Sequence, residues 1–457
     1  MRFTNTLTRQ LEDFTPQGDV VSLYVCGVTP YDVSHIGHAM SYVVFDVLKR
    51  YLVWRGYKVK HVQNFTDIDD RIIERANRRD MSTDALVEKF VNAYLDDMRD
   101  LNIVPPDAYP YATREVPEMI EIIKGLIDKG FAYEASSPQS EWSDVYYRVS
   151  AKSDYGKLAH RTQDSLLAGA RIEPGEQKEN PADFALWKGA KAGEPSWDSP
   201  WGRGRPGWHI ECSAMSLKYL GPQIDIHGGG EDLIFPHHEN EIAQTEAYTD
   251  NPPFVRYWLH NAWVKMGDEK MSKSLGNFVT IRDALDKVGA DALRLWTLTS
   301  HYRKPLTFSE DTLDAAKHGA DRLQTAARTP SFDGEGAIEI AAFRQRFIDA
   351  MDDDLNTPQA LAVLFDLAKE INRARDEGKG VATAQGALLE LADVLGMRLE
   401  QSERSIEAAP FVDLLVQIRN ELRAAKQFQL ADRVREGLAE LDIVLEDSPD
   451  GTSWKPA

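Results

Sequence analysis

Apolar and polar residues follow two different periods near the start of the chain. Residues 20–27 are almost continuously apolar, which is typical of a buried strand. From about 37 to 55 apolar residues recur at helical spacing, and residues 58–65 alternate like a second strand. A strand, a helix and a strand in succession predict a βαβ unit, and therefore a parallel sheet with ligands at the carboxyl ends of its strands.

The patterns that follow predict an interrupted sheet domain. Helical periodicity continues at residues 83–101 and 115–129. The segment from about 134 to 206 is instead rich in Ser, Pro, Gly and Trp, and strand-like runs return at 223–227 and 257–264. We therefore expect an insertion between two halves of one sheet domain.

The last third of the chain is predicted to be mainly helical. Segments rich in Ala and Leu have helical periodicity at residues 311–327, 338–351 and 358–374. A polar stretch at 401–405 then precedes a last unit of about fifty residues.

Length and charge limit the class of protein. The 457 residues allow two to four domains. We find neither an apolar leader nor a run near the ~18 apolar residues of a membrane span, so we expect a soluble, cytoplasmic protein without a membrane partner. The formal net charge of −20 argues against indiscriminate nucleic-acid binding. A nucleic-acid partner would need locally basic surfaces.

The chain has only two cysteines, Cys26 and Cys212. Two thiols in a long chain without a secretory leader indicate a reducing compartment, where disulfides are rare. Buried apolar cysteines are the simplest interpretation. The neighbouring histidines favour a metal site instead. His237 and Glu241 are four residues apart and face the same way on a helix, although His238 competes with His237 on spacing. Two sulfurs, one imidazole and one carboxylate suit zinc.

Two further motifs suit a nucleotide. His35-Ile36-Gly37-His38 follows the first strand, where helix amides bind anions, two imidazoles can donate to a phosphate, and Gly37 leaves room for the ligand. The loop 270–277 carries Lys270 and Lys273, which can neutralise a leaving pyrophosphate. Each motif alone is usually a structural turn, but both in this order are a much stronger signal.

These motifs resemble the two signatures of the class I aminoacyl-tRNA synthetases. Four further segments narrow the resemblance to the cysteinyl-tRNA synthetase family, over essentially the whole chain: Tyr24-Val25-Cys26-Gly27, Asn64-Phe65-Thr66-Asp67-Ile68-Asp69-Asp70, Gly207-Trp208-His209-Ile210-Glu211-Cys212 and Phe235-Pro236-His237-His238-Glu239-Asn240-Glu241. The resemblance implies an α/β fold with a Rossmann-like parallel-sheet catalytic domain, an insertion, a helical bundle and a small mixed α/β C-terminal domain. The expected boundaries are 1–116 and 207–265 for the two catalytic halves, 117–206 for the insertion, 266–308 for the lysine loop and stem-contact region, 309–398 for the tRNA-binding bundle, and 406–457 for the anticodon-binding domain.

The resemblance also implies the chemistry. It selects Cys26, Cys212, His237 and Glu241 as ligands of one zinc ion per chain, which recognises the thiol of L-cysteine. Serine differs by one atom, and an apolar pocket rejects such an analogue by no more than ~10²-fold. The expected reaction is activation of cysteine by ATP with Mg²⁺, then transfer to tRNA(Cys). His35 and His38 would hold the phosphates, and Lys270 and Lys273 the pyrophosphate.

Further binding residues are expected at named positions. Asp232 is our candidate for the ATP ribose, by analogy with acidic residues in dinucleotide sheets. Thr66, Trp208 and His227 are candidates for the amino-acid pocket. Four C-terminal residues are candidates for contacts with tRNA, although the same helix would also suit a solvated face: Arg419, Arg423, Lys426 and Trp454. We expect a monomer, because no coiled-coil or extra dimerisation segment is evident.

Two alternatives share these motifs. The cysteine:amino-sugar ligase of mycothiol synthesis has both signatures and the zinc cysteines, but it lacks the C-terminal unit and the 237–241 form of the helix. A non-catalytic zinc-containing RNA-binding paralogue would be expected to lose the signature histidines or the second lysine, and here both are intact.

Overall fold

The computed structural model describes residues 1–137, 140–162, 177–267, 269–270, 278–330, 338–400, 409–441, 443–448 and 451–456. It divides into two compact units, Met1–Leu399 and Glu400–Ala457. Within the described residues, no helix is long and apolar enough to cross a membrane.

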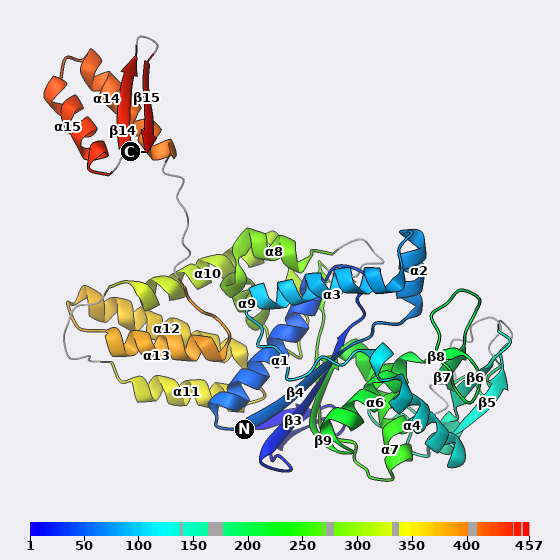
Figure 1. Cartoon of the computed structure of the whole chain (residues 1–457). Helices are drawn as coiled ribbons and strands as arrows, with labels where there is room; N and C mark the ends of the chain where they lie inside the picture. The colour runs from blue at the N-terminus through cyan, green and yellow to red at the C-terminus, as the bar shows by residue number, and fades with distance from the viewer. Residues whose placement is uncertain are drawn as a thin grey trace. The chain divides into compact units, whose positions relative to one another are not determined.

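A four-stranded parallel sheet forms the centre of the first unit (Figure 1). Its order is β10 (Val255–Asn261), β9 (Ile224–Gly230), β3 (Val20–Val28) and β4 (Lys58–Phe65). Helix α1 (Ile36–Trp54) connects β3 to β4, so the predicted βαβ unit is confirmed. The carboxyl ends of β3, β9 and β10 therefore lie at one edge of the sheet.

Helix α1 owes its position to an apolar face that repeats at helical spacing. Val43, Val47, Leu48 and Tyr51 on this face are fully buried or nearly so. Each such side chain contributes roughly 1.5–3 kcal/mol by its removal from water. The burial fixes the direction of α1, and with it the loop at its amino terminus.

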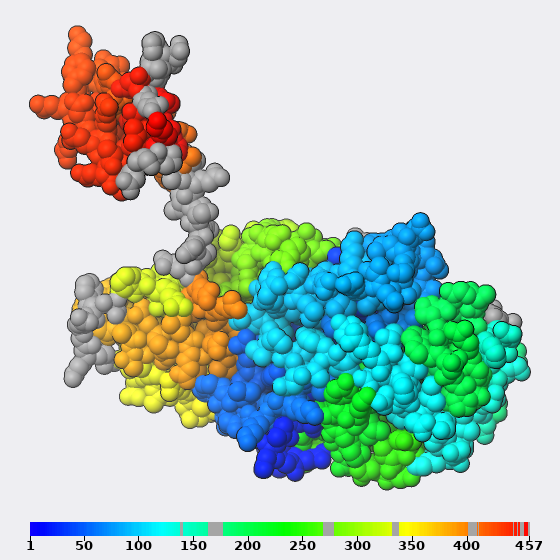
Figure 2. Space-filling model, in the orientation of Figure 1, coloured from blue at the N-terminus to red at the C-terminus, as the bar shows by residue number. Residues whose placement is uncertain are grey.

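The insertion is built around a different sheet. Helix α4 (Val116–Asp128) leads into four antiparallel strands, β5 (Ala132–Ser136), β6 (Ser143–Tyr147), β7 (Phe184–Gly189) and β8 (Gly204–Pro206). Their core is aromatic, and Trp187 is fully buried in it. Figure 2 shows this segment, in cyan to green, at one end of the first unit and the helical region, in yellow to orange, at the other.

The remaining elements of the first unit surround these two sheets. They are the hairpin β1 (Arg2–Asn5) and β2 (Gln10–Asp13), helices α2 (Asp70–Arg78), α3 (Thr83–Asp100), α6 (Trp208–Leu220) and α7 (Glu239–Thr249), and the three-stranded sheet of β11 (Val264–Met266), β12 (Glu269–Lys270) and β13 (Leu306–Phe308). The helical region comprises α8 (Ile281–Val288), α9 (Ala290–Leu298), α10 (Glu310–Arg328), α11 (Ile340–Asp352), α12 (Thr357–Asp376) and α13 (Ala382–Val394).

A buried ion pair joins the helical region to α1. The Arg294 guanidinium of α9 donates to a carboxylate oxygen of Asp46 in α1, at 2.5 Å, and both side chains are 0% exposed. Arg294 also donates to the backbone carbonyls of Leu101 and Leu395. These contacts satisfy a buried charge that would otherwise be costly.

The second unit is small and mixed α/β. It contains α14 (Ala409–Ala424), α15 (Phe428–Ala439) and the antiparallel hairpin β14 (Ile443–Ser448) and β15 (Gly451–Pro456). Its core is the cluster of Val412, Val416, Leu438 and Leu445. The predicted fold class is confirmed, whereas the individual domain boundaries remain predictions.

Candidate active site and metal centre

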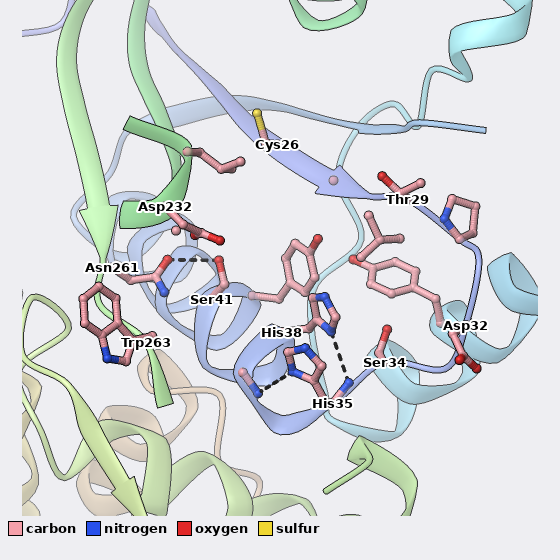
Figure 3. Close-up of a pocket in the computed structure, with 18 of the residues that line it drawn as sticks. Cys26, Thr29, Asp32, Ser34, His35, His38, Ser41, Asp232, Asn261 and Trp263 are labelled. Atoms are coloured by element: carbon pink, nitrogen blue, oxygen red, sulfur yellow. Dashed lines mark hydrogen bonds between the residues drawn. The ribbon is translucent and has the colours of Figure 1, made fainter. Parts of the chain in front are cut away.

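A cavity of about 440 Å³ opens at the carboxyl edge of the parallel sheet. Cys26, His35, His38, Trp208 and Asp232 all line it. In Figure 3, Cys26 on β3 lies on one side of this cavity and the two histidines of the α1 turn lie on the opposite side. Cys26 and the His35–His38 turn, which the sequence indicated as a metal-binding and a phosphate-binding feature, therefore line the same cavity.

His35 and His38 hold each other in one orientation at the start of α1. Their rings stack with centroids 3.9 Å apart. The backbone N–H of Gly37 donates to His35 Nδ1 at 3.1 Å, and the backbone N–H of His35 donates to His38 Nδ1 at 3.1 Å (Figure 3). Because both Nδ1 atoms accept, each neutral ring carries its proton on Nε2. The turn thus carries two stacked imidazoles, each with an N–H donor at Nε2.

The His35–His38 turn is also bonded to the segment that follows the lysine loop. Ile36 N donates to Val279 O, and Ile281 N donates to Ser34 O, each at 3.0 Å. Lys273 lies outside the described residues, and Lys270 is described only as a strand residue of β12. The described flank 278–281, which follows this loop in the chain, lies beside the turn.

Two glycines are required by close approach. An added Cβ at Gly27 would meet the backbone oxygen of Asn64 at 1.6 Å, because β3 and β4 pass closely there. At Gly37 it would meet the His35 ring at 2.9 Å. Gly37 therefore makes room for the imidazole that caps its own helix, in addition to any room it leaves for a ligand.

Four side chains that the sequence analysis grouped as metal ligands converge beside this cavity. The ligand atoms of Cys26, Cys212, His237 and Glu241 all lie within 4.8 Å of one another. The two sulfurs are 3.8 Å apart, Cys26 Sγ is 3.8 Å from Glu241 Oε1, and His237 Nε2 is 3.1 Å from the same oxygen. Ligands bound at about 2.0–2.3 Å in a tetrahedron are separated by roughly 3.3–3.8 Å, so the spacing suits a metal ion.

A second group shares two of these residues. Cys26 and Glu241 also lie within 4.8 Å of His227 and His238 ligand atoms. Cys26 Sγ is 3.3 Å from His238 Nε2 and 3.6 Å from His227 Nε2. His238, which competed with His237 on sequence spacing, thus remains a geometric alternative.

The chemistry of the first group also fits a cation. Burial raises the pKa of the Cys26 thiol and of the Glu241 carboxyl, and it lowers the pKa of the His237 imidazole. Without a cation the first two groups would retain their protons. Glu241 Oε2 is also buried and, among the residues that the structure describes, has no hydrogen-bond partner. A divalent ion would stabilise both anions and bind the neutral imidazole, so these residues can hold a metal.

Other histidines orient this cluster. His209 Nδ1 is 3.0 Å from His237 Nδ1, and this contact leaves His237 Nε2 facing Glu241. His260 Nε2 is 2.8 Å from His238 Nδ1, and its other nitrogen contacts Thr6 Oγ1 at 2.7 Å. Neither His209 nor His260 had a role predicted from the sequence. His209 lies within the quoted motif Gly207–Cys212, but only the strand register brings in His260.

The predicted amino-acid and ribose residues are placed differently. Trp208 lines the cavity, and its ring stacks on His237 with centroids 4.3 Å apart. Asp232 lines the cavity as well. Thr66 is buried, and its hydroxyl donates to Glu211 Oε2 at 2.8 Å, whereas His227 packs against Tyr24. Neither Thr66 nor His227 is among the residues that line the cavity.

Arg71 is a lining residue that the sequence analysis did not single out. Its guanidinium lies 5.2 Å from the Tyr31 ring and 6.0 Å from the Trp208 ring, and it donates to Thr29 Oγ1 at 3.2 Å. Among the described residues that line the cavity, it is the single Arg or Lys. Its position two residues after Asp69, in a quoted motif, was the available signal.

Of the four C-terminal candidates for contacts with tRNA, two make contacts within the unit and two are exposed. Arg419 is 2% exposed and donates twice to Asp447, at 2.7 and 2.8 Å, while the indole N–H of Trp454 donates to Asp413. Arg423 and Lys426 are exposed, although Arg423 also donates to Asp447. Arg419 therefore fastens α14 to the hairpin, and the two exposed cations remain accessible to a ligand.

Comparison with known proteins defines the class. The family model of the tRNA synthetases class I (C) catalytic domain matches residues 14–318, and the DALR domain model matches residues 346–400. The fold is similar to that of Mycobacterium tuberculosis methionyl-tRNA synthetase in complex with methionyl-adenylate, with a TM-score of 0.61, 16% identity, and coverage of 87% of this chain and 94% of that chain. It is also similar to LeuRS of Agrobacterium radiobacter K84 in a complex with tRNA and LeuAMS, with a TM-score of 0.59, 12% identity and 85% coverage of both chains. The fold and the catalytic-domain match are those of a class I tRNA synthetase.

Full-length relatives define the family. The chain is 56% identical over 461 residues to a cysteine–tRNA ligase of Dehalococcoides mccartyi, which covers 100% of this chain and 99% of the relative. It is 48% identical over 471 residues to a cysteine–tRNA ligase of Geobacillus thermodenitrificans, with the same coverage. The chain belongs to the cysteine–tRNA ligase family, and it is accordingly a ligase.

Proposed function

We propose that this protein is a cysteinyl-tRNA synthetase, which activates L-cysteine with ATP and transfers it to tRNA(Cys). One observation carries the proposal. A helix turn suited to phosphates lines the cavity, and a cluster of sulfur, nitrogen and oxygen ligands reaches the same cavity through Cys26, in a chain whose full-length relatives are cysteine–tRNA ligases. Those relatives also cover the C-terminal unit, which favours this function over an amino-sugar ligase.

Cys26, Cys212, His237 and Glu241 are the proposed ligands of one zinc ion. Zinc, when bound, supplies a Lewis acid that can take the thiolate of the substrate as a further ligand and leaves an alcohol unbound. Trp208, stacked on His237, forms the adjoining wall for the rest of the amino acid. The preference for cysteine over serine then comes from bond chemistry rather than shape, and no editing site is required.

The phosphate side of the cavity is proposed to bind ATP with Mg²⁺. His35 and His38 donate from Nε2 to the triphosphate, next to the first amides of α1. A carboxylate oxygen of cysteine attacks the α-phosphorus and pyrophosphate leaves, with Lys270 and Lys273 balancing its charge. Asp232 is proposed to accept from the ribose hydroxyls.

The second step is transfer to tRNA. A ribose hydroxyl of the terminal adenosine attacks the carbonyl carbon of the cysteinyl-adenylate, the bond to phosphate breaks, and AMP leaves. No protein nucleophile is needed, because positioning and electrostatics provide the rate. In the C-terminal unit, Arg423 and Lys426 are the exposed candidates for contact with the tRNA.

Pyrophosphate exchange tests the first step. We expect labelled pyrophosphate to enter ATP only when cysteine is present, and the exchange to stop after zinc is removed by a chelator. Exchange without cysteine, or equally fast exchange with serine, would exclude the proposed substrate. Lys273→Ala should slow the exchange, and an unchanged rate would exclude the proposed role of the loop.

A further inference from the structure

Tyr24 carries a buried hydroxyl that has no role in the proposed reaction. The residue is 0% exposed, and within the described residues its hydroxyl has no hydrogen-bond partner. Buried hydroxyls are normally hydrogen-bonded, because leaving one without a partner costs stability. The missing hydrogen bond therefore indicates a partner that becomes available in another state of the site.

Strand β3 places Tyr24 beside the proposed metal ligands. Tyr24 and Cys26 are two residues apart, so they face the same side of β3, and both belong to the core that contains Cys212. The Tyr24 ring stacks on His227 with centroids 5.0 Å apart, and His227 Nε2 is 3.6 Å from Cys26 Sγ. Burial raises the pKa of the Tyr24 hydroxyl, and the nearby Cys212 thiol raises it further, so the hydroxyl keeps its proton. Tyr24 is thus a rigidly held donor next to the cluster.

Cys212 is the sulfur of the cluster that lacks a donor. Cys26 Sγ has two histidine nitrogens nearby, at 3.3 and 3.6 Å. The thiol of Cys212 instead donates to Asn64 Oδ1 at 3.7 Å. The backbone N–H of Gly27 also donates to Asn64 Oδ1, at 3.0 Å, which identifies this atom as the amide oxygen. An amide oxygen cannot donate, so Cys212 loses this hydrogen bond when its sulfur is deprotonated.

We propose that Tyr24 is a positioning residue of the metal site, and that its hydroxyl donates to the Cys212 sulfur once this sulfur is deprotonated. The inference rests on the proposed function, because it assumes that zinc binds at this cluster. A hydroxyl hydrogen rotates about its C–O bond, so the bond can form while the ring stays stacked on His227.

The hydrogen bond has two consequences for the site. It stabilises the buried anionic sulfur of Cys212, which is the form that binds a metal ion. It also withdraws charge from this sulfur, and zinc held by a less basic ligand accepts the thiolate of the substrate more readily. Tyr24 therefore acts on metal affinity and on recognition of the substrate thiol without touching either the metal or the substrate.

The test compares Tyr24→Phe with Tyr257→Phe in the full-length protein. The first variant removes the hydroxyl beside the cluster. The second removes a buried hydroxyl from β10 of the same sheet, where it donates to the backbone oxygen of Asp13. Zinc affinity is measured by competition with a chromophoric chelator. We expect Tyr24→Phe to bind zinc roughly 10–100-fold more weakly, and Tyr257→Phe to bind it as tightly as the unaltered protein.

Two further measurements separate this role from a purely structural one. After removal of zinc, Tyr24→Phe should resist urea at least as well as the unaltered protein, because the deleted hydroxyl has no partner there, whereas Tyr257→Phe should be less stable. With Co²⁺ in place of zinc, Tyr24→Phe should move the sulfur-to-metal charge-transfer band to longer wavelength, since a sulfur without the hydrogen bond gives up charge more easily.

Equal zinc affinity in Tyr24→Phe and the unaltered protein would overturn the inference. An unshifted charge-transfer band would overturn it as well, because the hydroxyl would then not be bonded to a sulfur. Failure of the proposed function would look different: the unaltered protein would bind no zinc, or it would show no cysteine-dependent pyrophosphate exchange. The two failures are therefore distinguishable.

Discussion

The two sides of the candidate active-site cavity are built in opposite ways. On the metal side, the residues Cys212, His237 and Glu241 are no more than 1% exposed, and the rings of Trp208 and His209 contact His237. On the phosphate side, His35 and His38 are only partly buried and depend on backbone contacts of their own turn. A small ligand that must lose its water needs a rigid, buried site, whereas a triphosphate requires an open one. Mutations on the two sides should therefore have different effects on zinc content and on exchange.

The largest effect is expected on the metal side. Cys212→Ala removes one of the two proposed sulfur ligands. The zinc content should therefore fall from one equivalent to nearly none, and cysteine-dependent exchange should fall by at least ~10³-fold. Metal analysis and exchange assays measure both. Ser216→Ala, on the same helix, removes a hydroxyl bonded to Ser213 and should leave both unchanged. Full zinc content in Cys212→Ala would contradict the proposed ligand set.

The next largest effect is expected at the buried ion pair of Arg294 with Asp46, which packs the helical region against α1. Arg294→Met leaves the Asp46 carboxylate buried in α1 with less charge compensation, which should cost about 3–5 kcal/mol of unfolding free energy. Urea unfolding measures this loss. Arg346→Met, in an exposed pair, should cost less than about 1 kcal/mol. Equal losses in the two variants would show that the buried pair contributes no more to the unfolding free energy than the exposed pair.

A smaller effect is expected at the turn itself. His38→Ala removes one Nε2 donor and the acceptor of the His35 N–H, so exchange should fall about 10²-fold while zinc content stays at one equivalent. Cys212→Ala is expected to lose both zinc and exchange, whereas His38→Ala should lose exchange and keep zinc. This difference would show that the two sides are independent. Loss of zinc in His38→Ala would mean that the two sides are coupled.

The smallest effect is a pH dependence of the unfolding free energy, and it arises from a histidine that lies on neither side of the cavity. His61 in β4 is buried, and neither ring nitrogen has a hydrogen-bond partner in the described part of the chain. Burial lowers its pKa to about 3. Its ordinary pKa is about 6.5, so between these values the unfolded chain binds the additional proton and stability decreases as the pH falls. Lowering the pH from 7.5 to 5.5 should cost about 1.4 kcal/mol through this residue. His61→Phe should remove that part of the loss in urea unfolding, and an unchanged loss would contradict the assignment.

Much of the fold could be predicted because it depends on local periodicity. The strand, helix and strand of residues 20–65 and the helices of the last third follow their apolar patterns closely. The antiparallel sheet of the insertion was not predicted, because strands such as β8 are only three residues long and are defined by their partners. The hairpin β1–β2 was missed for the same reason.

The site could be predicted only in part. The signature turn and the i, i+4 relation of His237 and Glu241 are local, and the structure shows both. The approach of Cys26 to Cys212 depends on β3 and α6, which are far apart in the chain, and the residues alone could not show it. Ring contacts such as that of His260 with His238 depend on strand register and gave no local signal.

The central proposal is that a metal bound by the thiols of Cys26 and Cys212 recognises the thiol of the substrate cysteine. Zinc K-edge X-ray absorption on the purified protein counts the sulfurs bound to the metal. We predict two sulfur ligands without substrate, three after addition of cysteine, and two after addition of serine. A sulfur count that stays the same when cysteine is added would contradict the account.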